Sequence, residues 1–294
     1  MRARNGLQGA CLCGAVAFAI APPYRWFAHC HCSLCRKHHG TLFSTGLGVE
    51  RHKLDWLRGT DAVVHYRATA AFERPFCRHC GSTVPAASHD ERFWHVPAGL
   101  LAGDPGARPR SHIFVGSQSP LYEFADALPR HAAYPPGIDV APIERHRPSV
   151  AAGIITGSCL CDRIAFRVTA APRRLVNCYC SLCRRRSGAA FTSTLLAGTD
   201  AFEWLRGEDR VRHYALPSPR RYTADFCADC GSPTPVVAAG ATVMVPAGAV
   251  DTAVPPLPAV HLYVGSKAPW VAIGDAWPQF AELPPAERFT EFLA

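Results

Sequence analysis

Hydrophobic positions alternate over short stretches of this chain, and glycine or proline interrupts them at intervals of 8–15 residues. Val16, Phe18 and Ile20 alternate with alanines, and Ile164, Phe166 and Val168 repeat this pattern later in the chain. A period of two is typical of β-strands that turn one face toward a core. Further strands are predicted at 42–49, 62–67, 83–87, 93–96 and 112–115. Since no long amphipathic helix pattern interrupts them, the sequence predicts an all-β protein.

The chain carries the same pattern twice. Five cysteines of the first half recur 148 residues later, and two more recur 150 residues later. Other segments recur at the same offset. The four residues from Trp56 to Gly59, for example, are identical to those from Trp204 to Gly207. This period is too long for a solenoid and indicates two domains. We predict a first cysteine-rich domain at 5–131, a proline-rich linker at 132–152, a second cysteine-rich domain at 153–281 and a tail at 282–294.

The linker is longer than a direct connection between two domains requires. We therefore expect the two copies to pack against each other as a pseudo-dimer that imitates a homodimer of single modules. In the tail, residues 287–293 are predicted to form one short helix.

Composition restricts the cellular setting. Apolar residues make up 48% of the 294 positions, enough for buried cores. No secretory signal and no apolar run of about 18 residues is visible, so we expect a cytoplasmic protein without a membrane span. The net charge of +8 is scattered and forms no basic, aromatic-interleaved face, which argues against nucleic acid as a partner. In a reducing compartment, fourteen cysteines at fixed short spacings are typical of metal ligands.

One set of cysteines in each copy is split between two distant pairs. A closely spaced pair near the start of the copy is followed much later by a second pair. Four thiolates make the usual closed structural zinc site, which would clamp a small β-module that has little core. Gly81 and Gly231, each directly after the second pair, indicate a tight turn there. These split sites comprise Cys11, Cys13, Cys77 and Cys80 in copy one and Cys159, Cys161, Cys227 and Cys230 in copy two.

The other set is compact and provides the candidate catalytic residues. It comprises Cys30, Cys32 and Cys35 in copy one and Cys178, Cys180 and Cys183 in copy two. Three thiolates can hold a second zinc ion and leave its fourth position open, which distinguishes catalytic from structural zinc. Together the two kinds of cluster predict up to four zinc ions per chain.

The fourth ligand of the compact sites is left open. The histidines near this set in copy one, His29, His31, His38 and His39, are replaced in copy two by Asn177, Tyr179, Arg186 and Ser187. If both copies act alike, water or a substrate thiol is the simplest fourth ligand. The alternative is a third structural knuckle that an unidentified residue closes.

Basic residues directly follow the third compact cysteine in both copies. Arg36 and Lys37, with Arg184, Arg185 and Arg186, are candidates to pair with carboxylates of an anionic thiol, or they form a solvated basic turn. The recurring pairs His65/His213 and His112/His261 fall in predicted strands, where a lone histidine is typically structural.

These motifs resemble one known family. Gly9-x-Cys11-x-Cys13-Gly14-x-Val16, the segment from Cys30 to Lys37, and Phe76-Cys77-x-x-Cys80-Gly81 are similar to the glutathione-dependent formaldehyde-activating enzymes, a family that includes centromere-protein-V-like proteins. The resemblance implies an Mss4-like zinc-binding β-module, duplicated in tandem. It also implies a carbon–sulfur lyase activity, like that of S-(hydroxymethyl)glutathione synthase, on an adduct of glutathione or a similar thiol with an aldehyde.

Each copy departs from the family pattern somewhere. Asp162 stands where copy one has Gly14, Tyr179 where it has His31, and Leu121 where copy two has Trp270. One site can therefore be degenerate. The competing hypothesis is a non-catalytic zinc module that binds protein or nucleic acid.

Overall fold

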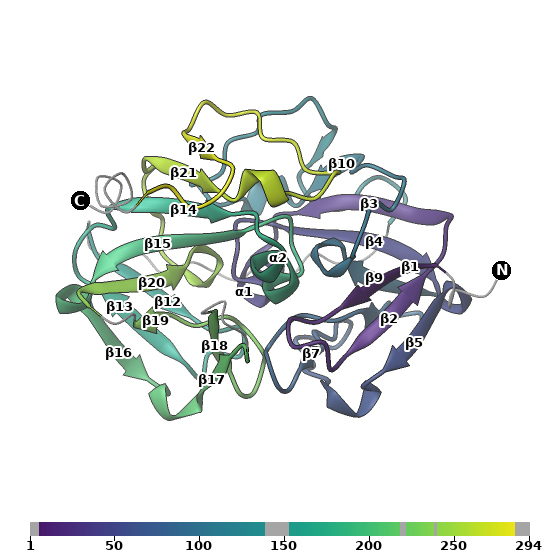
Figure 1. Cartoon of the computed structure of the whole chain (residues 1–294), viewed down its shortest axis with the longest axis horizontal. Coiled ribbons are helices and arrows are strands. Elements are labelled where there is room, and N and C mark those ends of the chain that lie inside the picture. The colour runs from purple at the N-terminus through teal and green to yellow at the C-terminus, as the bar shows by residue number, and fades with distance from the viewer. Residues whose placement is uncertain (1–5, 139–152, 218–221, 238–239, 286–294) are drawn as a thin grey trace.

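The computed structural model describes residues 6–138, 153–217, 222–237 and 240–285. Most of the linker and the predicted tail helix at 287–293 lie outside these described residues. Within them the protein is built mainly of short strands, and the all-β prediction is confirmed. Figure 1 shows the two copies side by side, with the short helices α1 and α2 between them.

Copy one contains one α-helix, eleven strands and several 3-10 turns. Its strands are β1 (Leu7–Ala10), β2 (Ala17–Ile20), β3 (Tyr24–Cys30), β4 (Ser44–Glu50), β5 (Leu54–Arg58), β6 (Val63–Val64), β7 (Phe76–Cys77), β8 (Ala86–Ala87), β9 (Phe93–Pro97), β10 (Ser111–Ile113) and β11 (Arg130–His131). The α-helix is α1 (Ser33–His39), and the 3-10 turns are η2 (Arg51–Lys53), η3 (Thr60–Ala62), η4 (Ala98–Leu100) and η5 (Val115–Ser117).

Copy two repeats this order. Its strands are β12 (Ile155–Ser158), β13 (Ala165–Val168), β14 (Arg174–Cys178), β15 (Thr192–Gly198), β16 (Phe202–Arg206), β17 (Val211–Ala215), β18 (Thr223–Cys227), β19 (Val236–Val237), β20 (Thr242–Pro246), β21 (Ala259–Leu262) and β22 (Gln279–Phe280). Its helices are α2 (Ser181–Ser187), η6 (Thr199–Ala201), η7 (Glu208–Arg210), η8 (Ala247–Ala249) and η9 (Val264–Ser266).

Each copy folds around one large sheet. In copy one the strand order is β11-β10-β3-β4-β9-β8, and in copy two it is β22-β21-β14-β15-β20-β19. The strand β10 runs parallel to β3 and β11, whereas the other pairings in this sheet are antiparallel. A separate three-stranded sheet, β1-β2-β5 or β12-β13-β16, carries the first cysteine pair of each copy at its turn. The duplicated topology therefore follows the duplicated sequence.

Several local features differ from the sequence prediction. The strands predicted at 62–67 and 83–87 are confined to Val63–Val64 and Ala86–Ala87, so His65 lies outside its predicted strand. The alternation in β2 predicts one buried face, but all four of its residues are buried, because its alternate positions are small alanines that also pack inside. The helices α1 and α2 were not predicted. Each is seven residues long, too short for a helical period to show, and each begins at a cysteine N-cap and ends at a left-handed glycine, Gly40 or Gly188.

The two copies contact each other through these helices. Helix α1 packs on η8 of copy two, and α2 packs on η4 of copy one. Aromatic side chains also meet across the boundary, with Phe43 and Phe191 at 5.3 Å and Phe27 and Trp270 at 5.5 Å between ring centroids. One apolar cluster of buried residues includes members of both copies.

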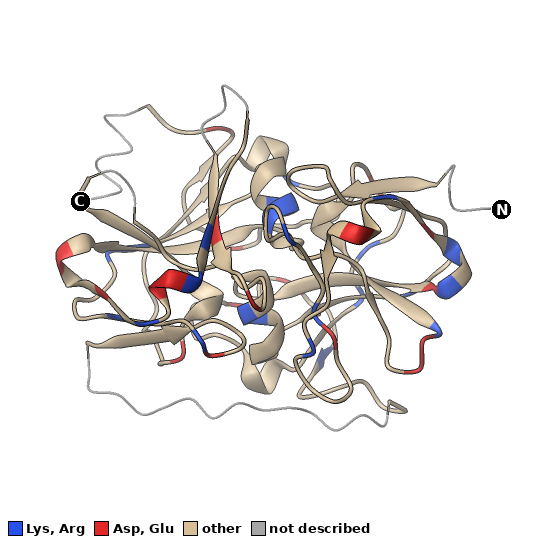
Figure 2. Cartoon of the chain, turned by 90° about the horizontal axis from the view of Figure 1, so that it is seen from below, with Lys and Arg blue, Asp and Glu red and all other residues tan. Residues whose placement is uncertain are grey.

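Charged residues of both signs are distributed over both copies, as Figure 2 shows for the view from below. Blue segments on two short helices lie near the centre of that view. Among the described residues, no helix has the length and apolar character needed to cross a membrane.

Candidate metal centres

The split cysteines come together in both copies. Cys11 and Cys13 lie in the turn between β1 and β2, and Cys77 and Cys80 lie at the end of β7 and in the turn after it. Their four sulfur atoms all lie within 4.8 Å of one another, with 3.4 Å between Cys11 and Cys13 and 3.7 Å between Cys13 and Cys77. A zinc ion with four sulfurs at about 2.3 Å requires sulfur–sulfur separations of about 3.8 Å. The donor set therefore fits tetrahedral zinc.

Copy two reproduces this geometry. Cys159 and Cys161 are 3.4 Å apart, and Cys161 and Cys227 are 3.7 Å apart, with Cys230 completing the cluster. Backbone amides support the sulfurs in both copies: Val16 donates to Cys11 and Ile164 donates to Cys159, each at 3.3 Å. Such contacts hold the sulfur atoms in place for a metal.

The thiols of a split site also alter each other's acidity. The pKa of Cys80 lies far below its usual range, because Cys11, Cys13 and Cys77 direct hydrogen bonds at its sulfur. The pKa of Cys77 is correspondingly raised by its contacts with Cys11, Cys13 and Cys80. Four thiols packed this closely thus favour at least one thiolate, which is the form that binds metal.

The compact cysteines converge at the start of the short helices. Cys30 ends β3, Cys32 is the N-cap of α1, and Cys35 lies in the first turn of the helix. The Cys32 sulfur accepts a hydrogen bond from the Cys35 amide at 3.4 Å, and the three sulfurs lie within 4.8 Å of one another. Cys178, Cys180 and Cys183 are arranged in the same way, and hydrogen bonds from Cys178 and Cys183 lower the pKa of Cys180 to about 3.

In the described parts of the chain, no histidine or carboxylate joins either three-sulfur cluster. Of the four candidate histidines of copy one, three have other hydrogen-bond partners, whereas His38 Nδ1 is buried and has none among the described residues. His29 Nδ1 lies 2.9 Å from the Thr45 hydroxyl, His31 Nε2 lies 2.9 Å from His112, and His39 Nδ1 contacts the Ser187 carbonyl oxygen. The fourth ligand position at each cluster is therefore left to groups other than these side chains.

Two buried hydrogen-bond chains lie behind the compact sites. In copy one, Asp126 contacts His112, which contacts His31. In copy two, Asp275 contacts His261, which contacts the hydroxyl of Tyr179 at 2.9 Å. These chains hold in place the residue that stands between the first two compact cysteines, which accounts for the recurrence of His112 and His261.

Sequence reasoning missed two side chains that face the compact clusters. Arg74 Nη2 lies 3.9 Å from the sulfur of Cys35, and the Tyr222 hydroxyl lies 3.8 Å from the sulfur of the counterpart Cys183. Burial alone would lower the pKa of Arg74, but the neighbouring sulfurs of Cys35, Cys32 and Cys30 raise it. Burial and the neighbouring Cys183 raise the pKa of Tyr222 well above its usual value. The two sites therefore differ, with a cation beside one cluster and a neutral phenol beside the other.

The basic residues that follow the third cysteine mostly make contacts within the protein. Lys37 is buried, pairs with Asp251 at 2.7 Å and donates to Ser158. Arg36 Nε donates to the His31 carbonyl oxygen, and Arg184 Nε makes the same contact with Tyr179. Arg185, the counterpart of Lys37, donates to the carbonyl oxygen of Cys11 in the other copy. Arg184 directly follows the compact cysteine Cys183 and is half-buried, whereas its counterpart Arg36 is buried.

Comparison with known proteins identifies the family of this chain. The model of the glutathione-dependent formaldehyde-activating enzyme family matches residues 6–117 and 154–266, so this chain belongs to that family and carries its domain twice. A curated protein of Halomonas elongata, described as a "putative glutathione-dependent formaldehyde-activating enzyme", is 31% identical over 129 residues, which are 41% of this chain and 81% of that protein. A crystal structure of a Rhodobacter sphaeroides protein matches 33% of this chain and 89% of its own, at 23% identity and a TM-score of 0.28.

Proposed function

We propose that this protein is a zinc-dependent carbon–sulfur lyase acting on the adduct of glutathione, or a similar thiol, with an aldehyde. The observation that carries this proposal is the three-sulfur cluster, to which no other ligand-type side chain of the described residues is added. A metal held by three thiolates keeps a position for a substrate atom, whereas four protein ligands would close it. Membership of the family supports thiol–aldehyde chemistry at that position.

The two kinds of cluster take separate roles in this proposal. Cys11, Cys13, Cys77 and Cys80, with their copy-two counterparts, hold structural zinc and clamp the three-stranded sheet of each copy to its two-stranded sheet, β6-β7 or β17-β18. Cys30, Cys32 and Cys35, with Cys178, Cys180 and Cys183, hold the second zinc, which gives up to four ions per chain. Zinc at this second site would lower the pKa of a bound thiol and hold it as a thiolate.

The reaction is a reversible addition. The thiol sulfur forms a bond to the carbonyl carbon of the aldehyde, the carbonyl π electrons move to oxygen, and the thiol proton ends on that oxygen. In the reverse direction the same carbon–sulfur bond breaks. The protein holds the two reactants together, and positioning contributes most of the modest acceleration that this easy reaction requires.

Arg74 and Arg184 are the chain's candidates for binding an anionic thiol. Arg74 places a cation beside the cluster of copy one, where the negative charge of a bound thiolate would add to that of the cysteines. Arg184 can turn its guanidinium to a substrate carboxylate, since it is half-buried and bound to backbone carbonyls alone. Arg36, Lys37 and Arg185 would act beside it by fixing the helices that carry the cysteines.

We further propose that the two domains, 5–131 and 153–281, act as a pseudo-dimer. Support comes from the reciprocal contacts of α1 with η8 and α2 with η4, and from Lys37 and Arg185, each of which bonds the opposite copy. In this arrangement each compact site depends on the other copy for the position of its helix.

The test uses cobalt in place of zinc, because cobalt bound to thiolates has visible absorption bands that respond to a new ligand. We expect glutathione to shift these bands in the wild-type protein, and S-methylglutathione, which has no free thiol, to leave them unchanged. The shift should fall by about half in Cys32→Ser or Cys180→Ser and disappear in the double variant. Formaldehyde exchange with glutathione, followed by NMR, should be faster with the wild type than with the double variant.

Zinc analysis provides the matching stoichiometry, with four ions per chain expected in the wild type and two in the double variant. Cobalt absorption bands that do not shift with glutathione, together with salt-sensitive binding to nucleic acid, would favour the non-catalytic zinc module instead.

A further inference from the structure

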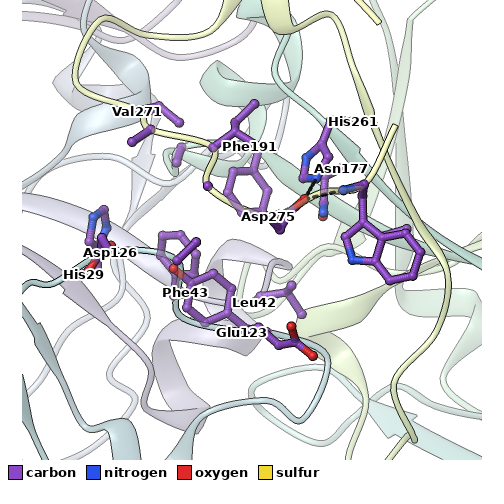
Figure 3. Close-up of a pocket in the computed structure, with 18 of the residues that line it drawn as sticks. His29, Leu42, Phe43, Glu123, Asp126, Asn177, Phe191, His261, Val271 and Asp275 are labelled. Atoms are coloured by element: carbon purple, nitrogen blue, oxygen red, sulfur yellow. Dashed lines mark hydrogen bonds and ion pairs between the residues drawn. The ribbon is translucent and has the colours of Figure 1, made fainter. Parts of the chain in front are cut away.

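A cavity of about 300 Å³ lies between the two copies, and none of the cysteines lines it. Aromatic and aliphatic side chains from both copies form its walls, among them Phe43, Tyr122, Phe191, Trp270 and Trp277. Figure 3 shows Phe43 and Phe191 between the side that holds His29 and the side that holds Asn177. Pockets for small molecules have volumes of about 300–1,000 Å³ and mostly apolar walls. This cavity has the size of one aromatic ring with a short substituent.

Two polar side chains in the lining offer unused hydrogen-bonding atoms. His29 and Asn177 occupy corresponding positions in β3 and β14 and are only 8% and 5% exposed. The Ser193 hydroxyl donates to the side-chain oxygen Oδ1 of Asn177 at 2.8 Å. The side-chain nitrogen Nδ2 of Asn177 has no hydrogen-bond partner among the described residues. Thr45 holds His29 Nδ1 at 2.9 Å in the matching way, and His29 Nε2 likewise has no partner in the described chain. When the Thr45 hydroxyl donates to His29 Nδ1, as the Ser193 hydroxyl donates to Asn177, the proton of the His29 ring is on Nε2. His29 Nε2 and Asn177 Nδ2 are then both N–H donors.

Carboxylates line the solvent-exposed parts of the cavity. Glu123, Asp126 and Asp275 are among its lining residues, and the side chains of Asp126 and Asp275 are 32% and 29% exposed. Arg108 also lines it, but its guanidinium is paired with Asp104 at 2.8 Å. A negatively charged ligand would therefore meet like charge there.

We propose that this cavity binds an uncharged aromatic molecule that carries a hydrogen-bond acceptor such as a carbonyl oxygen. The ring would occupy the space between the aromatic walls, and the acceptor would meet the N–H group of Asn177 or that of His29, which lie on opposite sides of Phe43 and Phe191. Each of these N–H groups has no hydrogen-bond partner in the described chain, so an acceptor that reaches one of them gains a hydrogen bond that gives both affinity and orientation. The cavity contains no cysteine, since Cys30 follows His29 in a strand and points to the opposite face of the sheet. It adjoins the compact site of copy two through Tyr179, the residue between Cys178 and Cys180.

Three probes of similar size test this proposal on the intact zinc-loaded protein. Acetophenone has the ring and the acceptor, ethylbenzene has the ring alone, and benzoate adds a negative charge. Binding is measured by ligand-observed NMR titration. We expect saturable binding of acetophenone, about five- to tenfold weaker binding of ethylbenzene because the hydrogen bond is missing, and still weaker binding of benzoate. Equal affinity for acetophenone and ethylbenzene, or no binding of either, would overturn the proposal.

Two variants locate the site. Ala190→Leu gives copy two the residue that copy one carries as Leu42, fills the cavity and should abolish acetophenone binding. Trp277→Ser removes an exposed side chain of the wall and should weaken binding several-fold. The matched control is Leu205→Ser, which removes an equally exposed apolar side chain that lies outside the cavity. If Ala190→Leu does not fold, as judged by thermal melting, the comparison of Trp277→Ser with Leu205→Ser decides. Unchanged binding in the folded variants rules the site out.

Discussion

Arg74 and Tyr222 make the two compact sites chemically different, although their cysteines superpose in pattern. The guanidinium of Arg74 stands beside Cys35, whereas the corresponding cysteine of copy two is faced by the phenol of Tyr222. A cation stabilises an additional thiolate more strongly than a neutral hydroxyl does. We therefore expect copy one to be the better site for an anionic thiol.

This difference predicts the effect of Arg74→Met, which keeps the apolar stem and removes the charge. In a Cys180→Ser background, where only copy one can respond, glutathione affinity should fall about tenfold while zinc content stays unchanged. The measurement is the cobalt-band titration with glutathione. Arg67→Met is the control, because Arg67 pairs with Glu73 at the surface. An equal loss of glutathione affinity in Arg67→Met, or no loss in Arg74→Met, would show that Arg74 does not contribute to thiol binding.

Single residues also show what the sequence could and could not predict. The spacing of Cys11, Cys13, Cys77 and Cys80 was sufficient to group these four cysteines across some sixty residues, because two closely spaced pairs are typical of one metal site. Arg74 gave no such signal. It lies 39 residues from Cys35 and reaches that sulfur only because the chain folds back beside the cluster. Contacts of this kind depend on tertiary packing and have no local pattern.

The two cysteine classes should respond differently to mutation. Cys77→Ser removes one of four ligands from a buried site whose metal binding would be coupled to folding, so the protein should become unstable or protease-sensitive. Cys32→Ser removes a ligand at a helix start, and the protein should stay folded and lose about one zinc ion. Cys227→Ser and Cys180→Ser should repeat the contrast. Thermal melting and zinc analysis are the measurements, and equal destabilisation by both kinds of change would mean that every cluster is structural.

At the scale of elements, α1 and α2 connect the two copies. Each helix begins at a compact cysteine and continues into a residue that bonds the other copy: Lys37 contacts Asp251 and Ser158, and Arg185 contacts the carbonyl oxygen of Cys11. Ser158 and Cys11 both belong to the segments that carry the first cysteine pair. The basic residues after the third cysteine thus have a structural use that their position next to a candidate catalytic site did not indicate.

The Lys37 contact predicts a measurable loss of stability. Lys37→Met keeps most of the side-chain volume but leaves Asp251 and the Ser158 carbonyl oxygen without the ammonium group, which should lower the free energy of unfolding by about 3 kcal/mol. Arg92→Met breaks the exposed pair with Asp90 and should change it by at most about 1 kcal/mol. Urea denaturation of both variants measures the difference. Similar effects would show that the buried contact does not hold the helix.

At the scale of the whole molecule, the repeat predicted two modules, and the interlocking of their residues was not visible in the sequence. Gly81 and Gly231 illustrate the limit. The sequence indicated a tight turn after the second cysteine pair, and both glycines have positive φ angles of 66° and 72°. The structure adds that a Cβ atom at Gly81 would lie 2.4 Å from Phe226 of the other copy, and one at Gly231 would lie 2.3 Å from Phe76. The requirement for glycine is thus set partly by the opposite copy, which no local signal reveals.

This interlocking predicts that the two copies unfold together. Leu34 of helix α1 belongs to the same buried cluster as Cys159, Cys227 and Cys230 of copy two, and Leu182 of helix α2 packs against the cluster that contains Cys11 and Cys77. Loosening one split site should therefore withdraw support from the helix that carries the compact cysteines of the other copy.

Scanning calorimetry of the zinc-loaded wild type should show one transition, since neither copy keeps its buried surface alone. Cys227→Ser should lower the midpoint of that single transition and, in the cobalt-substituted protein, weaken the glutathione response of copy one as well as copy two. Cys180→Ser, which alters a cluster at the half-exposed start of α2, should shift the midpoint much less. Two separate transitions in Cys227→Ser, with the higher one at the wild-type temperature, would show that the copies are independent domains and that their contacts contribute little to stability.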